Sequence, residues 1–440
     1  MWEIERHCNQ LIARKKRVNN GRFFSTVSWA VWAGVGVVAN AAIAQEVLRL
    51  SLANDAFTQT HQQASATLGY YNLLMGPATW RFNSGLSTEY NNNVHVQNSN
   101  PQGDVVFRPN LDASIHWPLT ENNSLDAGLG LGYSLYSKNS DLNQFTISPG
   151  SGTAFNVYVG DFTINLHDQI SILENGTQTP GNAGNSTGNN ARLQNVIGSA
   201  ATWNLNQAQA MLDYDHANYA GLGSMQSIRD GQSENISAAF GVHIRPEIIV
   251  GVEGGGGLYN YAKSSNISFF SPDAKQWNAG AFCSAQISEH ITARFDAGYT
   301  ELLPDAVDAS FDAADAKNFY FQTSVTHIVN AAFNYSLSAG RSLDFQFYGQ
   351  PYSHYFVRVQ PNWTFLQKYT LSTPFSWEDG TQVYQNTVNF NQFSGAIQLG
   401  RQITKHLSAT IYDRLTVETS SQTAYDYTVN IVGLSIIYQF

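Results

Sequence analysis

The sequence predicts an all-β fold: a transmembrane, antiparallel, up-and-down β-barrel of about 18 strands, with 16 as the alternative count. Three observations lead to this fold class. The last residues alternate between two faces and end on an aromatic, the chain is poor in charge, and its alternating runs are joined by connectors that are short and long in turn. A barrel strand shows one face to lipid and the other to a polar lumen, which requires this alternation.

The stretch from Tyr425 to Phe440 has the period of a strand. From Thr428 onward every second residue lies on one face, and this face becomes apolar and then aromatic at Tyr438 and Phe440. An apolar edge strand in an open sheet would invite pairing with other chains, whereas a closed barrel has no edge. We therefore expect this strand to close a barrel.

The composition excludes two broad classes of protein. Of the 440 residues, 43% are hydrophobic but only 13% are charged, about half the charged fraction of a typical soluble domain. A helical membrane protein would need several apolar runs of about 20 residues, and the chain has one such run, near its beginning. Its mean hydropathy of -0.25 also argues against that class.

Residues Met1 to Ala44 combine a basic stretch with an apolar run and small residues at the end, so they predict a cleaved signal peptide. An N-terminal membrane anchor is the alternative. Cleavage would remove six of 23 basic and two of 33 acidic residues, leaving a net charge of -14. This balance disfavours nucleic acid as a partner. Cys283 would be the only remaining cysteine, and no Cys/His cluster has metal-ligand spacing, so we expect no metal and no cofactor.

Residues 45–77 have mixed periodicity and are predicted to form an N-terminal extension or a plug in the lumen, with an extra strand as the alternative. The barrel is expected over residues 78–440. Its short connectors are predicted at Pro118 to Asn123, Gly160-Asp161, Asn204 to Gln207, Arg245 to Glu247, Ser288 to His290, Val329-Asn330, Pro361-Asn362 and Thr404 to His406. The longer, polar connectors include Ser137 to Gly152, Leu302 to Ala316 and Pro374 to Thr381.

When each strand is phased by its apolar row, the charged residues fall on the other row. A lipid-facing arginine at the bilayer midplane would cost roughly 2 to 4 kcal/mol, so the charged row is assigned to the lumen. The residues predicted to line the pore are Arg81, Glu89, Arg108, Asp112, Asp126, Arg245, Glu253, Arg294, Asp296, Arg358, Lys368 and Arg414. Such mixed charges would filter solutes in a water-filled pore. Alternatively, they neutralise one another in a plugged lumen.

The connector from Leu302 to Ala316 carries aspartates at spacings of three or four among alanines, a pattern that suits a short acidic helix. These residues are Asp305, Asp308, Asp312 and Asp315. One interpretation is a constriction loop folded into the pore. The other is a solvated outer loop that binds divalent cations bridging lipopolysaccharide.

The chain resembles the Gram-negative outer-membrane β-barrels of the porin class in its terminal strand, its signal peptide and its regular succession of hairpins. More loosely, the hairpin WPLTENNSLDAGLGLGYSLY at residues 117–136 is similar to another β-barrel porin type. The resemblance covers Ala78 to Phe440. It implies the bacterial outer membrane as location, lipid and lipopolysaccharide as surroundings, and a barrel-assembly machinery that reads Tyr438 and Phe440 as its signal. The resemblance allows a homo-oligomer but does not specify the oligomeric state.

The function expected from these features is a porin for passive diffusion of small hydrophilic solutes. The alternatives are a non-conducting barrel that acts as an adhesin or as a sheath for a partner protein, and a transporter of apolar substrates with an N-terminal plug. No G-x-S-x-G or H-E-x-x-H pattern occurs, so no catalytic residues and no enzyme activity are expected. Ion selectivity stays open, because the chain is net negative while the predicted pore list is more basic than acidic.

Overall fold

The computed structural model describes residues 71–174, 191–222, 230–261, 273–305, 316–345, 351–382 and 388–440. The predicted signal peptide, residues 45–70 of the predicted extension, and Asp308, Asp312 and Asp315 lie outside these ranges. Within them, no helix is long and apolar enough to cross a membrane.

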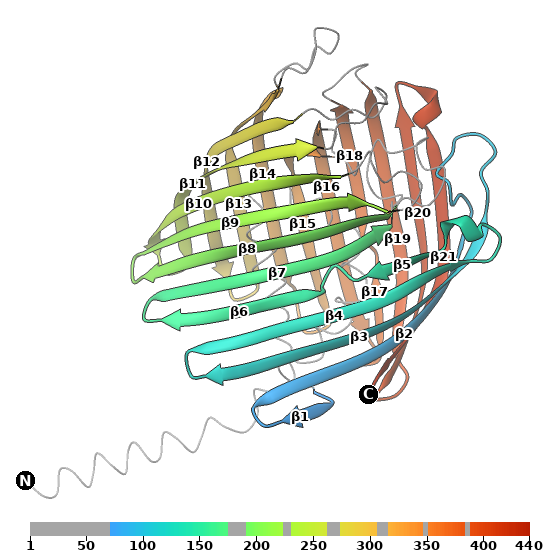
Figure 1. Cartoon of the computed structure of the whole chain (residues 1–440), viewed down its shortest axis with the longest axis horizontal. Helices are drawn as coiled ribbons and strands as arrows, with labels where there is room; N and C mark the ends of the chain where they lie inside the picture. Colours follow the sequence, from blue (N-terminus) through green and yellow to red (C-terminus); the bar gives the residue numbers. More distant parts are fainter. Residues whose placement is uncertain are drawn as a thin grey trace, which may run out of the picture.

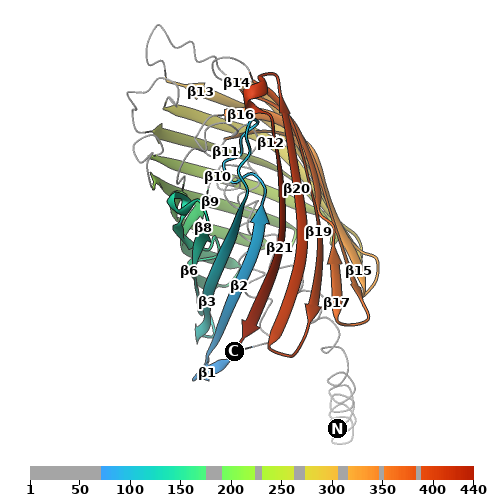
Figure 2. The ribbon, with the colours of Figure 1, turned by 90° about the vertical axis from the view of Figure 1, so that its right-hand side faces the viewer.

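The chain forms a closed antiparallel barrel of 18 strands (Figures 1 and 2), which confirms the predicted fold class and strand count. Except for β5 with β6 and β17 with β18, each strand pairs with the next along the chain, and β2 pairs with β21 to close the wall. The strands are β1 (Leu73–Met75), β2 (Ala78–Asn91), β3 (Asp104–Thr120), β4 (Asn123–Tyr136), β5 (Gln144–Ile147), β6 (Gly152–Val159), β7 (Phe162–Glu174), β8 (Ala191–Leu205), β9 (Ala208–Gly221), β10 (Gly231–Arg245), β11 (Ile248–Tyr261), β12 (Ala274–Ser288), β13 (Ile291–Pro304), β14 (Ala316–Ile328), β15 (Phe333–Phe345), β16 (Pro351–Phe365), β17 (Tyr369–Ser372), β18 (Phe375–Gln382), β19 (Asn389–Gln402), β20 (Leu407–Ser420) and β21 (Tyr427–Gln439).

Two places in the wall are each filled by two short strands. β5 and β6 both pair with β4 on one side and β7 on the other, and β17 and β18 lie in the same way between β16 and β19. β1 is an additional short strand that pairs with the beginning of β2. Two single-turn 3-10 helices, η1 (Ser140–Leu142) and η4 (Thr423–Tyr425), lie in the longer connectors.

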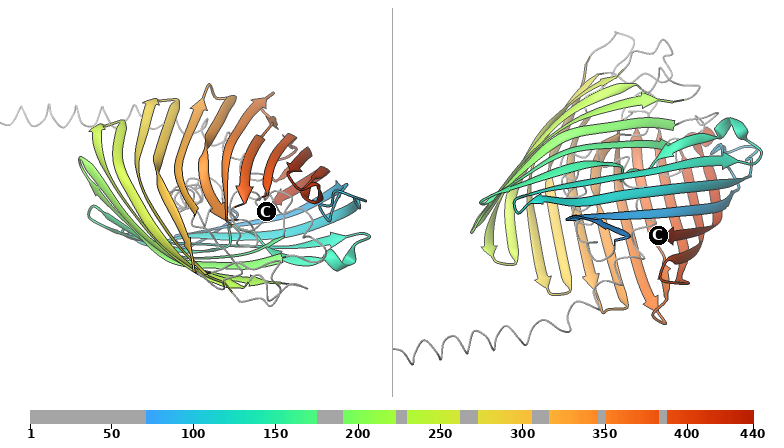
Figure 3. Two further views of the ribbon diagram at one scale, coloured as in Figure 1. Left: turned by 90° about the horizontal axis from the view of Figure 1, so that it is seen from above. Right: turned by 60° about the horizontal axis from the view of Figure 1, so that its bottom comes forward.

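The two faces of the wall differ in burial. The wall is a single layer of strands (Figure 3). Among the described residues no second layer covers its outer face, so a buried side chain on a strand points inward. In β16 the even-numbered residues Tyr352, His354 and Phe356 are buried, whereas Tyr355 and Trp363 are exposed. The same alternation runs through β21, where large apolar residues such as Leu434 are exposed. An exposed apolar row of this kind fits a barrel in the outer membrane, the location expected from the sequence.

Three inward-facing glycines of β4 make room for the break between β5 and β6. Ser148 and Ser151 lie over Gly130, with the Ser148 N–H donating to the Gly130 carbonyl at 2.9 Å and the Gly130 N–H donating to Ser151 Oγ at 2.9 Å. A Cβ on Gly130 would lie 2.6 Å from the Ser148 Cβ. The glycine therefore allows the interrupted strand to fold against the wall.

Two of the predicted connectors are wrong. Pro361-Asn362 lies within β16, whose turn to β17 is formed by residues 366–368, and most of the predicted loop Pro374 to Thr381 is β18. Both errors have the same cause. β16 pairs with β17 up to Ser372 and with β18 from Phe375. Pro361 has no N–H to donate, and it lies opposite the break between β17 and β18, where no ladder bond is lost. The predicted connector Ser137 to Gly152 likewise contains β5. The other seven short connectors join consecutive strands.

Substitution of Gly130 by alanine is expected to lower the free energy of unfolding by about 1 to 3 kcal/mol, because the added methyl group overpacks against Ser148. Urea unfolding in detergent micelles measures this change. Gly395→Ala is the control, since the nearest atom to its Cβ would be 4.0 Å away. Equal effects of the two substitutions would contradict the packing role of Gly130.

Candidate functional site

The inner row of the strands carries the candidate site. Most of the residues predicted to line the pore lie on this row, and several are brought together in ionic centres. By strand they are Arg81 and Glu89 on β2, Arg108 and Asp112 on β3, Asp126 on β4, Glu253 on β11, Arg294 and Asp296 on β13, Arg358 on β16 and Arg414 on β20.

The first centre lies on β11, β13 and β14. Arg294 Nη2 is 2.7 Å from Asp296 Oδ1 and 3.4 Å from Glu253 Oε2. The Tyr320 hydroxyl donates to Glu253 Oε1 at 2.9 Å. The Arg294 guanidinium also lies 4.7 Å from the centre of the Phe282 ring, a cation–π contact. Two carboxylates thus hold one arginine whose side chain is still 23% exposed, while theirs are 6% and 3% exposed.

Glycines explain why the rings can lie flat on the inner wall. A Cβ on Gly251 would lie 2.5 Å from the Phe282 ring, and a Cβ on Gly280 or Gly298 would collide with the Tyr320 hydroxyl. Aromatic rings that cover glycines on neighbouring strands shield the exposed backbone. The Phe282 ring contacts Arg294 and the Tyr320 hydroxyl binds Glu253, so the two rings position both charged side chains.

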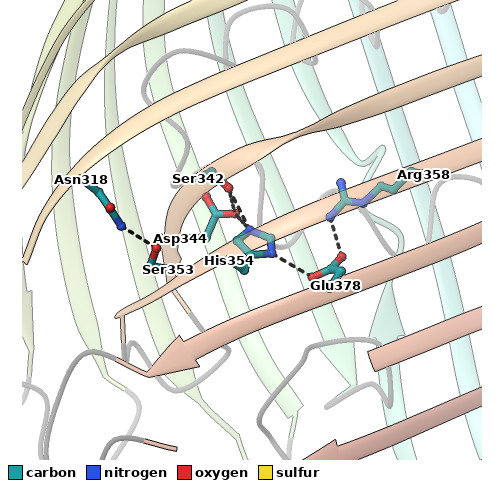
Figure 4. A network of polar contacts seen from close by, with 7 residues as sticks. All are labelled: Asn318, Ser342, Asp344, Ser353, His354, Arg358 and Glu378. Atoms are coloured by element: carbon teal, nitrogen blue, oxygen red, sulfur yellow. Dashed lines mark hydrogen bonds and ion pairs between the residues drawn. The ribbon is translucent and has the colours of Figure 1, made fainter. Parts of the chain in front are cut away.

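The second centre joins β15, β16 and β18 (Figure 4). Arg358 Nη2 donates to Glu378 Oε1 at 2.8 Å, and His354 lies between two carboxylates, with Nε2 2.8 Å from Asp344 Oδ2 and Nδ1 3.2 Å from Glu378 Oε2. The Ser342 hydroxyl is 2.8 Å from His354 Nε2. His354 and Asp344 are almost completely buried. Figure 4 also shows Asn318 and Ser353, which are hydrogen-bonded and link β14 to β16.

The order Ser342, His354 and Glu378 has the residue types of a hydrolytic triad, but its geometry does not support that chemistry. A base must offer one ring nitrogen to accept the serine proton. Here Asp344 Oδ2 lies 2.8 Å from His354 Nε2, the same nitrogen that the Ser342 hydroxyl approaches, so this nitrogen is placed to donate to the carboxylate and not to accept the serine proton. The histidine is also buried away from any solute. The centre is therefore a structural ion network.

The third centre spans the closure of the barrel. Arg108 Nε donates to Glu89 Oε1 at 3.0 Å and its Nη1 donates to Ser134 Oγ at 2.5 Å. The Tyr412 hydroxyl of β20 donates to the other Glu89 oxygen at 2.8 Å. Glu89 thus connects β2 to β3 and also, across the intervening β21, to β20.

A chain of polar side chains that the sequence analysis missed runs across β3, β4, β6, β7 and β9. Its links are His116 Nδ1 to Asp126 Oδ1 at 2.6 Å, Asn156 Nδ2 to Asp126 Oδ2 at 3.1 Å, Asn165 Nδ2 to Asn156 Oδ1 at 2.7 Å, His167 Nδ1 to Asn165 Oδ1 at 2.9 Å, and His167 Nε2 to Asp215 Oδ1 at 2.7 Å. Of these residues only Asp126 was predicted to line the pore, because the meeting of the others depends on the register between strands.

The remaining predicted residues are not gathered into these centres. Asp112 accepts a hydrogen bond from Asn110 at 2.6 Å. Arg245 is the exposed last residue of β10, and Lys368 lies in the exposed turn between β16 and β17 rather than on a strand. Asp305 forms an exposed ion pair with Lys275 at 3.8 Å, and the other three aspartates of the predicted constriction loop lie outside the described residues. The role of all these residues in lining a pore stays a prediction.

At the end of the barrel with the long connectors, apolar side chains cover parts of the inner face. One buried cluster joins β8 to β15 and consists of Val196, Ala217, Tyr219, Tyr259, Ala274, Leu302 and Leu343. A second places Val96, from the connector between β2 and β3, against Tyr427, Val429 and Ile431 of β21. The lumen is therefore partly filled by its own wall at this end. Among the described residues, no group of three or more His, Cys, Asp or Glu could hold a metal ion.

No protein-family profile and no curated protein matches the chain. Among solved structures, it is similar to OccAB3 of Acinetobacter baumannii, with 12% identity, a TM-score of 0.46, and coverage of 82% of this chain and 99% of that one. It is also similar to OccK2 (OpdF) of Pseudomonas aeruginosa in complex with glucuronate, with 10% identity, a TM-score of 0.47, and coverage of 82% and 98%. Likeness at this level transfers neither family nor solute.

Replacement of Arg294 by methionine is expected to destabilise the barrel by about 3 kcal/mol, because Glu253 and Asp296 would face each other without their shared cation. Unfolding in urea measures the change. Lys275→Met, which removes an exposed, 3.8 Å ion pair, should cost less than about 1 kcal/mol. A loss at Arg294 no larger than at Lys275 would show that the centre contributes little to stability.

Proposed function

We propose that the chain is an outer-membrane porin through which small hydrophilic solutes diffuse passively. The observation that carries the proposal is the direction of the ionic contacts. Arg108 meets Glu89 on the neighbouring strand, Arg358 meets Glu378 on the neighbouring strand, and Arg294 meets Asp296 on its own strand and Glu253 on β11, two strands away. Charges that pair along the wall do not bridge the lumen, and a barrel of 16 to 18 strands is wide enough for an aqueous channel.

We further propose that the pore favours cations. Arg108, Arg294 and Arg358 are each paired with a carboxylate, so they contribute little net positive potential. The described inner row carries further carboxylates that contact histidine or amide side chains. Asp126 meets His116 and Asn156, Asp215 meets His167, and Glu418 accepts a hydrogen bond from Gln392 at 3.0 Å. The excess of carboxylates would attract cations into the lumen.

Single-channel recording in a planar bilayer with a salt gradient tests both statements. We expect stable conductance steps whose reversal potential has the sign of a cation-selective channel. Steps with anion selectivity would overturn the cation preference alone. A folded barrel that stays silent would contradict the porin and favour the non-conducting alternative, which the buried apolar clusters at the long-connector end of the lumen support.

The double substitution Asp126→Asn and Asp215→Asn is expected to lower the ratio of cation to anion permeability by about twofold or more, because it removes two inner-row charges while preserving shape. Asp379→Asn is the matched control. Asp379 is exposed and receives a hydrogen bond from Asn391 at 3.3 Å, on the row of β18 opposite to the buried Glu378. A reversal potential shifted equally by both changes would show that the inner row does not set selectivity.

A further inference from the structure

The strand that closes the barrel leaves the first residues of its partner uncovered. β21 pairs with β2 only from Asn83, opposite Gln439, to Asn91, opposite Ile431. β2 begins at Ala78, so its residues 78–82 are not paired with β21. An unpaired strand edge exposes N–H and C=O groups, which is costly near lipid and open to pairing with other chains.

The short strand β1 occupies this edge. Leu73 pairs with Trp80 and Met75 pairs with Ala78, and the chain turns back at Gly76, whose φ is +59°. A positive φ at the turn of a tight hairpin favours glycine. Since β2 is covered by β3 on its other side, β1 and β21 share one edge and lie end to end along it. Figure 1 shows β1 beside the beginning of β2, near the end of β21.

Asn72 fills the gap between the two ladders. Its backbone N–H donates to the Trp80 carbonyl at 2.9 Å, and its side-chain Oδ1 accepts from the Phe82 N–H at 2.8 Å. Its Nδ2 donates to the carbonyl of Phe440, the residue after β21. Phe440 in turn donates its N–H to the Phe82 carbonyl at 3.2 Å. One asparagine thus binds both strands of the closure at the point where their own pairing ends.

Side chains on the outer face reinforce this junction. Leu73 pairs directly with Trp80, so the two side chains share a face. Trp80 stacks on Phe82 with ring centres 6.0 Å apart, and Tyr438 and Phe440 form an edge-on pair at 5.2 Å. Backbone pairing and aromatic packing therefore meet at the same end of the closure.

We propose that residues 71–76 act as an intramolecular clasp that secures the closure of the barrel by binding the end of β21. The clasp is independent of what passes through the lumen. It assigns a binding role to the segment just before the barrel, where the sequence pattern indicated only an extension, a plug or an extra strand.

Amide hydrogen exchange on the folded protein in micelles tests the clasp. Asn72→Ala and Gly76→Val are expected to speed exchange of the Phe82 and Phe440 amides about tenfold, because the first removes the bridging amide and the second strains the positive-φ turn. Gly160→Val is the matched control: Gly160 also has a positive φ, +58°, in a tight turn between β6 and β7, and both glycines have open space where a Cβ would stand.

The control should speed exchange around β6 and β7 and leave Phe440 unchanged. If Phe440 exchanges at the native rate in both Asn72→Ala and Gly76→Val, the clasp is wrong, even if β1 itself frays. If Gly76→Val fails to refold, Asn72→Ala still decides, because it leaves the turn intact. Faster exchange of β21 in all three variants would mean a general loosening of the barrel and would also overturn the proposal.

Discussion

The structure depends on the pairing of β2 with β21. These are the first and the last of the 18 wall strands, and their pairing closes the barrel. Their contact is supported along its whole length: Asn72 and β1 at one end, Glu89 with Tyr412 on the inner face, and Val96 with Tyr427 at the other end. Closure is thus a distributed interaction rather than a single ladder of backbone bonds.

Closure also determines what the inner face can do. Once the wall is a ring, its inward-facing charges must be paired with one another or hydrated within the lumen. The structure does so between nearby strands, with arginines laid over aromatic rings and held by carboxylates, as at Arg294 and Arg358. This arrangement keeps ionic contacts on the wall, which is the condition for a passage through the centre.

Glycines connect the backbone to this inner chemistry. Gly251 and Gly298 leave space in which Phe282 and Tyr320 lie flat, and Gly130 admits the break between β5 and β6. Gly76 has a different role, since its positive φ turns the chain into the clasp. The abundance of glycine in this chain therefore reflects close packing against the wall as well as turns.

The sequence by itself determined the fold class, the strand count and most of the short turns, because alternation and turn residues are local properties. It placed Arg294, Asp296 and Glu253 on the inner row, but it did not predict that Glu253 meets Arg294, since that contact depends on the register of strands and on rings over glycines. It misassigned Pro361 and Pro374: Pro374 lies in the break between β17 and β18, and Pro361 of β16 faces that break. Only the closed structure decided which charges neutralise one another, because those contacts depend on the register between strands. Only the closed structure decided how Asn72 joins the two ends of the barrel, because Asn72 and Phe440 lie 368 positions apart.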